Sequence, residues 1–178
     1  MRRWFDNGRS VGAELDRRWA LALHQGSAKP LLLGLLRWCS RFGDGPMWAA
    51  LLLVLPLAGG PNGWYCAELV AVLGGANVLV YWALKFATRR SRPCTECPGI
   101  RACVRVPDRF SFPSGHTLHA VAFAMLLSAY YPALAPLLWG YAALVALARV
   151  VLGVHYPSDV LVGALLGVVS ASIALAVA

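Results

Sequence analysis

Long apolar stretches separated by short polar turns occupy the chain from residue 46 onward. They fall at residues 46–60, 65–87, 115–131, 133–152 and 159–178. Each is rich in Leu, Ala and Val without a period of two, so each predicts a helix rather than a strand. Most are long enough to cross a bilayer, while the first is short and contains Pro56. The pattern therefore predicts an all-α, polytopic transmembrane helix bundle of about five spans.

A segment before the first run has a mixed helical pattern. Apolar side chains recur every four positions among charged ones, at Val11, Leu15, Trp19 and Leu23. A helix with one apolar stripe and a charged remainder lies in the membrane interface rather than across it. We therefore expect an amphipathic interfacial helix over residues 11–24, preceded by a frayed basic terminus over residues 1–10.

A second N-terminal segment, residues 30–42, is rich in Leu but carries Arg37 and Arg41. Its uncharged run is too short to cross a bilayer, so we expect another interfacial or re-entrant helix. The chain then divides into an N-terminal basic, amphipathic segment, residues 1–45, and a transmembrane domain, residues 46–178.

The composition excludes a water-soluble protein. The 178 residues are 59% hydrophobic and 13% charged, whereas soluble domains average about 25% charged residues. From residue 113 to residue 178 the only formal charges are those of Arg149 and Asp159, too few to cover a domain in water. The net charge of +8 favours an anionic membrane surface as the partner. No motif that reads nucleic acid accompanies this charge, so nucleic acid is not an expected partner.

Three polar clusters stand at the ends of apolar runs, at residues 85–93, 113–116 and 149–159. The first cluster ends the second run, the next begins the third run, and the last joins the fourth run to the fifth. Because successive spans cross a membrane in opposite directions, all three clusters come to the same membrane face. That face therefore gathers cations, histidines and a carboxylate at one depth.

The clusters have the chemistry of an anion site. Ser114 is a suitable N-cap for the helix that follows, and Gly115 lets a ligand approach the backbone closely. Free N–H groups at such a helix start attract anions. Lys85, Arg92 and Arg149 add three cations that are costly near a bilayer unless an anion joins them. Phosphate suits them, since its oxygens accept the forked donors of arginine.

The histidines extend this chemistry. His155 and Asp159 are four residues apart, with Pro157 opening the last helix between them. Asp159 could accept a hydrogen bond from one imidazole nitrogen, which makes the other nitrogen a better nucleophile. Each cation alone would be an ordinary snorkelling residue, and His119 favours a structural or solvent-facing role. The combination on one face points instead to a reaction on phosphate.

Read in order, the clusters are Lys-x6-Arg-Pro, Pro-Ser-Gly-His and Arg-x5-His-x3-Asp. They resemble the motifs of the type 2 phosphatidic acid phosphatase superfamily over about residues 30–178, and the chain resembles its small bacterial membrane-bound members. The three motifs together are specific, although Pro-Ser-Gly-His alone is not. Ala148 stands where the family usually has Ser before the arginine of the third motif. This departure removes one phosphate hydrogen bond but no catalytic group.

The resemblance implies a role for each motif residue. His155 would attack phosphorus and form a phosphohistidine, Asp159 would orient and activate it, and His116 would protonate the leaving oxygen and later activate water. Five residues would hold the phosphoryl group: Lys85, Arg92, Ser114, Gly115 and Arg149. The resemblance implies no metal and no cofactor, and the sequence has no carboxylate cluster at this face for Mg²⁺.

The function implied is that of an integral membrane lipid phosphatase. Undecaprenyl diphosphate, phosphatidylglycerophosphate and phosphatidic acid are the substrates considered. A lipid phosphotransferase using the same site is the nearest alternative. A transporter or a non-catalytic scaffold is less favoured, because the ionisable residues gather at span ends rather than at the bilayer midplane and the motifs keep every catalytic position.

Two features of the sequence disagree about which side of the membrane the site faces. The turns opposite the clusters carry no Lys or Arg, which puts the cluster face in the cytoplasm by the positive-inside rule. The resemblance instead implies an extracytoplasmic, periplasmic active site in the cell inner membrane. Cys94, Cys97 and Cys103 favour a disulfide in an oxidising space over a zinc site, for which a fourth ligand is missing. We expect the extracytoplasmic face.

Overall fold

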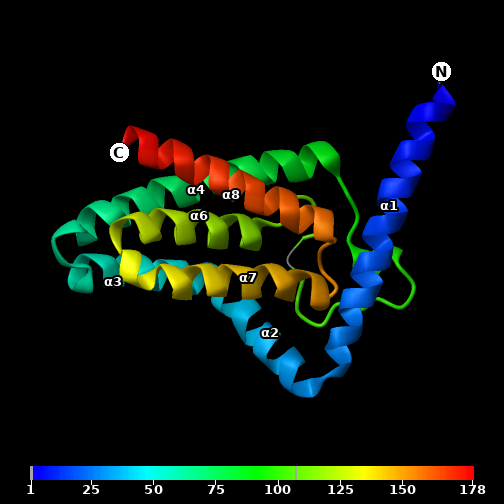
Figure 1. Ribbon diagram of the computed structural model, residues 1–178, viewed down its shortest axis with the longest axis horizontal. Coiled ribbons are helices and arrows are strands. Elements are labelled where there is room, and N and C mark those ends of the chain that lie inside the picture. Colours follow the sequence, from blue (N-terminus) through cyan, green and yellow to red (C-terminus); the bar gives the residue numbers. More distant parts are fainter. Residues whose placement is uncertain (1, 107) are drawn as a thin grey trace.

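Helices account for nearly all of the regular structure (Figure 1). The computed structural model describes residues 2–106 and 108–178, and this part of the chain holds eight α-helices. Five of them run side by side along the long axis: α3 (Gly45–Ala58), α4 (Gly63–Thr88), α6 (Gly115–Tyr130), α7 (Ala135–Val151) and α8 (Pro157–Val177). The predicted all-α bundle of about five spans is confirmed, and its helix boundaries lie within a few residues of the apolar runs.

The five helices differ in length. The segments Gly60–Thr88, Pro132–Val151 and Pro157–Val177 are long and apolar enough to cross a membrane, and Met47–Ala58 is a shorter apolar helix. α6 has 16 residues, or about 24 Å at 1.5 Å per residue, less than the roughly 30 Å of a hydrocarbon core. It is enclosed by α4, α7 and α8, so protein rather than lipid surrounds most of it.

Small residues set the close contact between α6 and α8. A Cβ atom on Gly163 would lie 2.6 Å from the backbone oxygen of Ser114, and one on Gly167 would lie 2.6 Å from that of Leu118. Helices in membranes pack closely where small residues let their backbones approach. The last helix therefore presses directly on the start of α6, where the second polar cluster lies.

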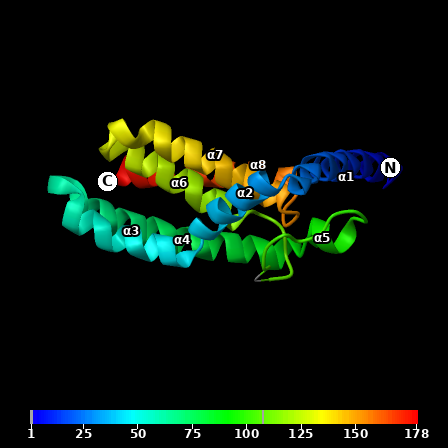
Figure 2. The same ribbon diagram turned by 90° about the horizontal axis from the view of Figure 1, so that it is seen from below.

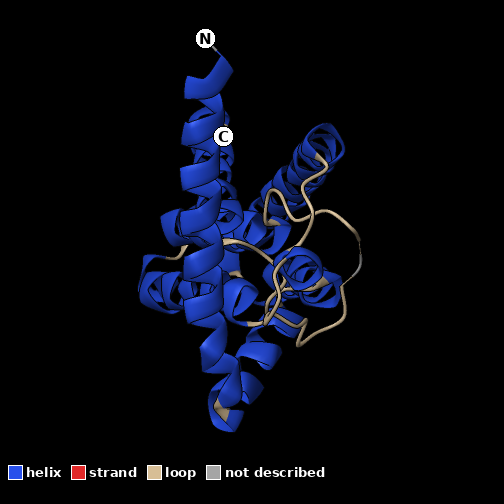
Figure 3. Cartoon of the chain, turned by 90° about the vertical axis from the view of Figure 1, so that its right-hand side faces the viewer, coloured by secondary structure: helices blue, strands red, loops and turns tan. Residues whose placement is uncertain are grey.

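The N-terminal helices cover one end of the bundle. α1 (Arg2–His24) crosses that end at a steep angle to the bundle axis, and α2 (Pro30–Phe42) leads back into α3 (Figures 1 and 2). The end-on view in Figure 3 shows α1, which starts at the N label, in front of this end of the bundle. Helices are thus present over both segments for which interfacial helices were predicted, but the expected frayed start over residues 1–10 is wrong, because the helix begins at Arg2.

α1 turns its apolar stripe away from the protein. Val11 and Trp19 are 60% and 61% exposed, as suits a helix that rests in the lipid interface. The stripe that faces the protein holds Asp16, Ala20 and His24, all buried. Residues four apart share one helix face, so the face with Asp16, Ala20 and His24, and not the one with Val11 and Trp19, attaches this helix to the bundle.

Asp16 makes the strongest of these attachments. Its Oδ2 lies 2.5 Å from Nη2 of Arg90, and its Oδ1 accepts the backbone N–H of Ser158 at 3.0 Å. The Ser158 hydroxyl also donates to Asp16. The other side of the same guanidinium binds Asp159 Oδ1 at 2.7 Å. One arginine thereby links α1 to the first turn of α8.

The long polar loop between α4 and α6 contains three cysteines with free thiols, Cys94, Cys97 and Cys103. The disulfide expected among them is therefore absent. Cys97 is buried, and its sulfur lies 3.4 Å from the Tyr156 hydroxyl. In this position the thiol acts as a packing residue under α1, beside Ala20.

Replacing Asp16 by Ala should loosen α1. The change leaves Arg90 with one carboxylate instead of two and removes an acceptor for Ser158, which should lower the free energy of unfolding by about 1–3 kcal/mol. Glu14→Ala is the matched control, because Glu14 is exposed and its ion pair among the described side chains is with Arg18 on the same helix. Thermal unfolding in detergent measures both variants. Equal melting temperatures for the two would show that the Asp16 contacts do not stabilise the fold.

Gly163→Ala should disturb the contact between α6 and α8. The added methyl group would press on the Ser114 carbonyl, and overpacking of this kind costs about 1–3 kcal/mol. Gly140→Ala is the control, since a Cβ at Gly140 on α7 meets nothing within 4 Å and replacement of a helical glycine gains about 0.5–1 kcal/mol. Melting temperatures in detergent should fall for the first variant and hold or rise for the second. A Gly163→Ala protein as stable as the control would contradict the close packing.

Candidate active site

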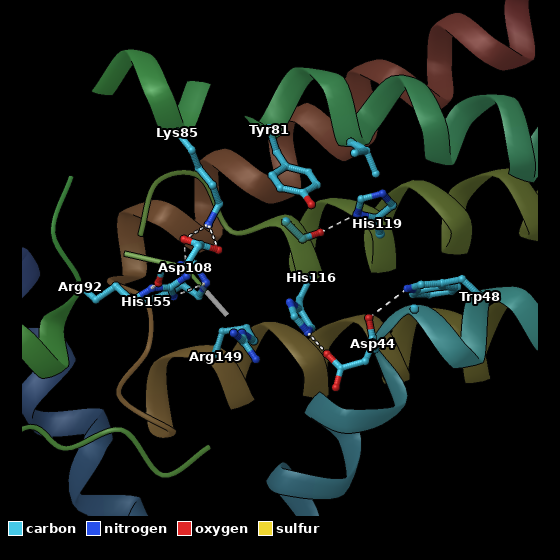
Figure 4. A pocket seen from close by; sticks show the side chains of 14 residues that line it. Asp44, Trp48, Tyr81, Lys85, Arg92, Asp108, His116, His119, Arg149 and His155 are labelled. Carbon is cyan, nitrogen blue, oxygen red and sulfur yellow. Dashed lines mark hydrogen bonds and ion pairs between the residues drawn. The ribbon is translucent and has the colours of Figure 1, made fainter. Parts of the chain in front are cut away.

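A cavity of about 230 Å³ lies where α3 and α6 begin and α4 and α7 end. Its wall includes six of the eight residues singled out from the sequence: Lys85, Arg92, Gly115, His116, Arg149 and His155. They come from α4, the long loop, the start of α6, the end of α7 and the turn before α8, and they converge as Figure 4 shows. The parity of the spans therefore predicted correctly which distant residues meet.

Two of the cations share one carboxylate. Lys85 Nζ lies 2.9 and 3.0 Å from the two carboxylate oxygens of Asp108 and donates to the Phe110 carbonyl at 2.9 Å. Arg92 Nη2 donates to Asp108 Oδ1 at 3.0 Å, and its Nε donates to the Asp108 carbonyl at 2.9 Å. Both cations are at most 3% exposed. Asp108 thus supplies the counter-charge that a buried cation requires.

Arg149 is held differently. Its side chain is 3% exposed, and Nη1 donates to the Ser40 hydroxyl at 2.5 Å. No acceptor contacts its Nε among the described residues. A buried guanidinium with an unused donor and no carboxylate favours the binding of an anion beside it.

His155 presents one ring nitrogen to the cavity. Arg92 Nη1 lies 3.3 Å from His155 Nε2 and also donates to the Val154 carbonyl at 2.8 Å. Because a guanidinium can only donate, Nε2 must carry the lone pair and Nδ1 the proton. Nδ1 faces Asp159 Oδ2 at 3.6 Å, which is longer than a hydrogen bond. The imidazole is therefore oriented with a free electron pair toward the cations.

Asp159 and Ser114 lie behind the cavity wall rather than in it. Asp159 is fully buried, and its Oδ2 accepts the backbone N–H of Tyr156 at 2.8 Å in the cap of α8. Ser114 caps α6, as predicted, and its hydroxyl lies 2.9 Å from that of Thr117. The Ser114 N–H donates to the Asp159 carbonyl at 3.0 Å. The starts of α6 and α8 are thereby joined, while the Ser114 hydroxyl points to its own helix instead of the cavity.

His116 is paired with a carboxylate that lies 72 residues earlier in the sequence. Its Nε2 lies 2.8 Å from Oδ1 of Asp44, the N-cap residue of α3 (Figure 4). This pairing leaves Nδ1 as the ring nitrogen available to a ligand. The hydrogen bond from His116 is the main cause that lowers the pKa of Asp44. The turn itself is fixed by Trp48, which donates to the Gly43 carbonyl at 3.0 Å.

His119 and Tyr81 form the apolar side of the cavity. His119 Nδ1 lies 2.8 Å from the Gly115 carbonyl, and its ring meets that of Tyr81 edge to face at 5.9 Å between centroids. The structural role favoured for His119 agrees with these contacts, although the residue does line the cavity. The described residues contain no group of three or more His, Cys, Asp or Glu side chains suited to a metal ion.

Charge and burial set the ionisation of the loop residues. Burial by itself raises the pKa of Asp108. The contacts with Lys85 and Arg92 lower this pKa by more than burial raises it, so the net shift is downward. Asp108 is therefore a carboxylate at neutral pH. Burial lowers the pKa of His155 well below its usual value of 6.5, and the neighbouring charges of Arg149 and Arg92 act in the same direction. His155 is accordingly a neutral imidazole at neutral pH.

Sequence reasoning missed both carboxylates of the cavity. Asp44 lies outside the three polar clusters, and Asp108 lies in the polar loop without a motif around it. One signal was available, because buried cations such as Lys85 and Arg92 require an acid nearby. The chain has only eight acidic residues, and two of them, Glu96 and Asp108, lie between the first two clusters, so these two were the natural candidates.

Comparison with known proteins identifies the family. The sequence profile of the PAP2 superfamily matches residues 65–178. The decaprenylphosphoryl-5-phosphoribose phosphatase of Mycobacterium tuberculosis is 34% identical over 142 residues, which are 78% of this chain and 76% of that protein.

Two crystal structures share the fold. A transmembrane PAP2-type phosphatidylglycerolphosphate phosphatase from Bacillus subtilis has a TM-score of 0.77 and 24% identity, with 93% of this chain and 85% of that chain covered. Aquifex aeolicus LpxE has a TM-score of 0.75 and 26% identity, with 86% and 92% covered. With three motifs in one cavity, a helical bundle and a matching family profile, the chain belongs to the PAP2 superfamily, as a multi-pass membrane phosphatase.

Proposed function

We propose that the protein removes a phosphoryl group from a lipid phosphate or diphosphate by way of a phosphohistidine at His155. The observation that carries this proposal is the meeting of one neutral imidazole with three cations, Lys85, Arg92 and Arg149, in a buried cavity. Asp108 offsets one positive charge of the three. The two in excess match the charge of about −2 on a phosphomonoester.

The first half of the reaction transfers the phosphoryl group to the protein. The lone pair on His155 Nε2 attacks phosphorus, and the bond between phosphorus and the leaving oxygen breaks. His116 enters this step protonated on both ring nitrogens and gives the Nδ1 proton to that oxygen, while its Nε2 stays bound to Asp44. The cations stabilise the charge that spreads over the phosphoryl oxygens as the bonds change.

The second half returns the protein to its starting state. A water molecule loses a proton to His116 and attacks the phosphohistidine, and the bond between phosphorus and His155 Nε2 breaks. Inorganic phosphate and a neutral imidazole result. The neutral state of His155, which burial and its cationic neighbours favour, suits both its attack and its release as a leaving group.

Two carboxylates would position the histidines. Asp44 contacts His116 at 2.8 Å and can stabilise the protonated ring before the first half-reaction and after the second. Asp159 lies 3.6 Å from His155 Nδ1, and a small rotation of the imidazole toward it would form the hydrogen bond that activates Nε2. We therefore assign Asp159 the orienting role, which it combines with capping α8.

The substrate is a phosphorylated lipid, since the cavity opens at the end of a bundle of apolar helices. Undecaprenyl diphosphate, phosphatidylglycerophosphate and phosphatidic acid are candidates. The name of the mycobacterial relative adds a polyprenyl-linked sugar phosphate to them. All of these place a phosphate at the membrane surface within reach of His155.

We propose that the active site faces the extracytoplasmic side of the cell membrane. Counting Lys and Arg favours the cytoplasm, yet three of the counted cations serve the fold. Lys85 and Arg92 are bound to Asp108, and Arg90 is bound to Asp16. These cations are therefore explained by local pairing, which weakens the count as an indicator of orientation.

The two histidines should respond differently to the leaving group. A general acid matters most for a poor leaving group such as a lipid alkoxide. His116→Ala should therefore lose about 100-fold or more in kcat/KM on phosphatidic acid, and much less on p-nitrophenyl phosphate. His155→Ala should abolish release of phosphate from both substrates, because both require the attack.

The measurement is kcat/KM for phosphate release by purified protein, with folding checked by thermal unfolding in detergent. A lipid diphosphate has a better leaving group than phosphatidic acid, so the loss of kcat/KM in His116→Ala on this substrate should lie between the losses on the other two. Normal turnover by a folded His155→Ala protein would rule out the phosphohistidine. Equal losses of His116→Ala on all substrates would leave His116 as a phosphate-binding residue only.

Orientation can be tested with single cysteines in a chain whose five native cysteines are replaced by Ser. Arg109→Cys marks the exposed loop at the active-site end, and Asn62→Cys marks the exposed turn at the opposite end. A membrane-impermeant maleimide added to intact spheroplasts should label the first and reach the second only after lysis. The reverse pattern would put the active site in the cytoplasm.

A further inference from the structure

A second recess adjoins the catalytic cavity. Its volume is about 450 Å³, and it shares Asp44, His116 and Arg149 with the cavity wall. Its outer wall carries three further arginines: Arg37, Arg41 and Arg105. The first two belong to α2 and the third to the loop before α6. We call this space the basic recess.

The three arginines of the outer wall have no ion-pair partner among the described side chains. None of the ion pairs formed by residues 11–45, 47–106 and 108–178 includes them. Arg37 Nε donates to the Cys103 carbonyl at 2.9 Å, and the two Nη nitrogens form no hydrogen bond with the described residues. Arg90 and Arg92, in contrast, are each bound to carboxylates. Asp44 is the one carboxylate among the residues that line the recess, and His116 binds it.

Arg149 connects the two spaces. Its guanidinium is buried in their common wall, beside His155 on one side and His116 on the other (Figure 4). Its Nε lacks an acceptor among the described residues, although the side chain is 3% exposed. A buried donor left without a partner is costly. The common wall is therefore prepared for an anion on at least one side.

We infer that the basic recess binds a second anionic group of the substrate, a phosphate or phosphodiester that stays on the leaving group. The inference rests on the proposed function, in which His116 protonates the leaving oxygen. Because His116 stands in the common wall, the leaving group extends from the catalytic cavity into the recess. Three arginine forks there suit the oxygens of a phosphodiester, which each fork can bind through two parallel hydrogen bonds.

Apolar surface continues from the recess. The next depression shares Arg41 and Asp44 with it and is otherwise apolar, with Trp38, Phe42, Met47 and Ala50 in its wall. Phe42 and Met47 also belong to an apolar groove between α3, α6 and α7. A hydrocarbon chain that leaves the recess can follow this groove into the membrane. The order of surfaces thus matches a lipid whose terminal phosphomonoester is separated from its chain by a second phosphate.

Two lipids with the same acyl chains isolate the contribution of the recess. Dioleoyl phosphatidylglycerol phosphate carries a terminal phosphomonoester and an inner phosphodiester, whereas dioleoyl phosphatidic acid carries the monoester alone. The ratio of kcat/KM for the first lipid to that for the second is measured in mixed micelles with full-length protein. We expect the ratio to exceed one, because only the first lipid can fill the recess.

Removing the arginines should remove the preference. Hydrogen bonds to charged groups are worth roughly tenfold or more in affinity. Each of Arg37→Gln, Arg41→Gln and Arg105→Gln should therefore lower the ratio by about tenfold, and the triple variant should bring it near one. Arg101→Gln is the matched control, because Arg101 is exposed in the same loop and outside the recess. It should leave the ratio unchanged.

The outcomes separate this inference from the proposed function. An unchanged ratio in the triple variant overturns the second subsite, and so does an equal loss on both lipids, which is the result expected if the arginines only attract anionic membrane surfaces. In either case hydrolysis of phosphatidic acid by the unmodified protein still supports the phosphatase.

If the unmodified protein hydrolyses neither lipid, the proposed function fails. The affinity of the protein for the two lipids then tests whether the basic recess binds a second phosphate. His155→Ala protein should then bind the two-phosphate lipid about tenfold more tightly than phosphatidic acid, and the triple arginine change should abolish the difference. Equal binding of the two lipids by His155→Ala protein overturns the inference.

Discussion

The burial of cations at one end of an apolar helix bundle is the constraint on which the structure depends. Lys85, Arg92 and Arg149 are each at most 3% exposed, and an uncompensated charge in such a place costs several kcal/mol. Asp108 satisfies the first two and Ser40 binds the third. The long polar loop must therefore fold back over the bundle end, and Arg149 keeps a charge that no carboxylate of the described residues pairs.

Two mechanical features hold this arrangement. At Gly163 the backbone of α8 approaches that of α6 so closely that Ser114 and Asp159 are joined by a main-chain hydrogen bond. Arg90 adds a second constraint, since it holds Asp159 with one side of its guanidinium and Asp16 with the other. The turn that carries His155 is thus fixed from the core by helix packing and from outside by α1.

The division of the polar end into two spaces follows from which cations are paired. Those of the catalytic cavity are partly neutralised by Asp108, whereas Arg37, Arg41 and Arg105 have no carboxylate partner in the described part of the chain. His116 stands between the two spaces with Asp44 behind it. An amphiphile with a terminal phosphate, a second anion and a chain fits this order of surfaces.

The sequence by itself determined the helices and the face on which the motifs meet. Apolar runs form helices in a membrane because the backbone must bond to itself, and the parity of the crossings then brings Lys85, His116 and His155 together. Only the tertiary structure decided that Asp108 and Asp44 would complete the cavity, and that α1 would dock through Asp16 instead of its apolar stripe. Such pairings depend on how a loop and an interfacial helix pack in space, which local periodicity does not encode.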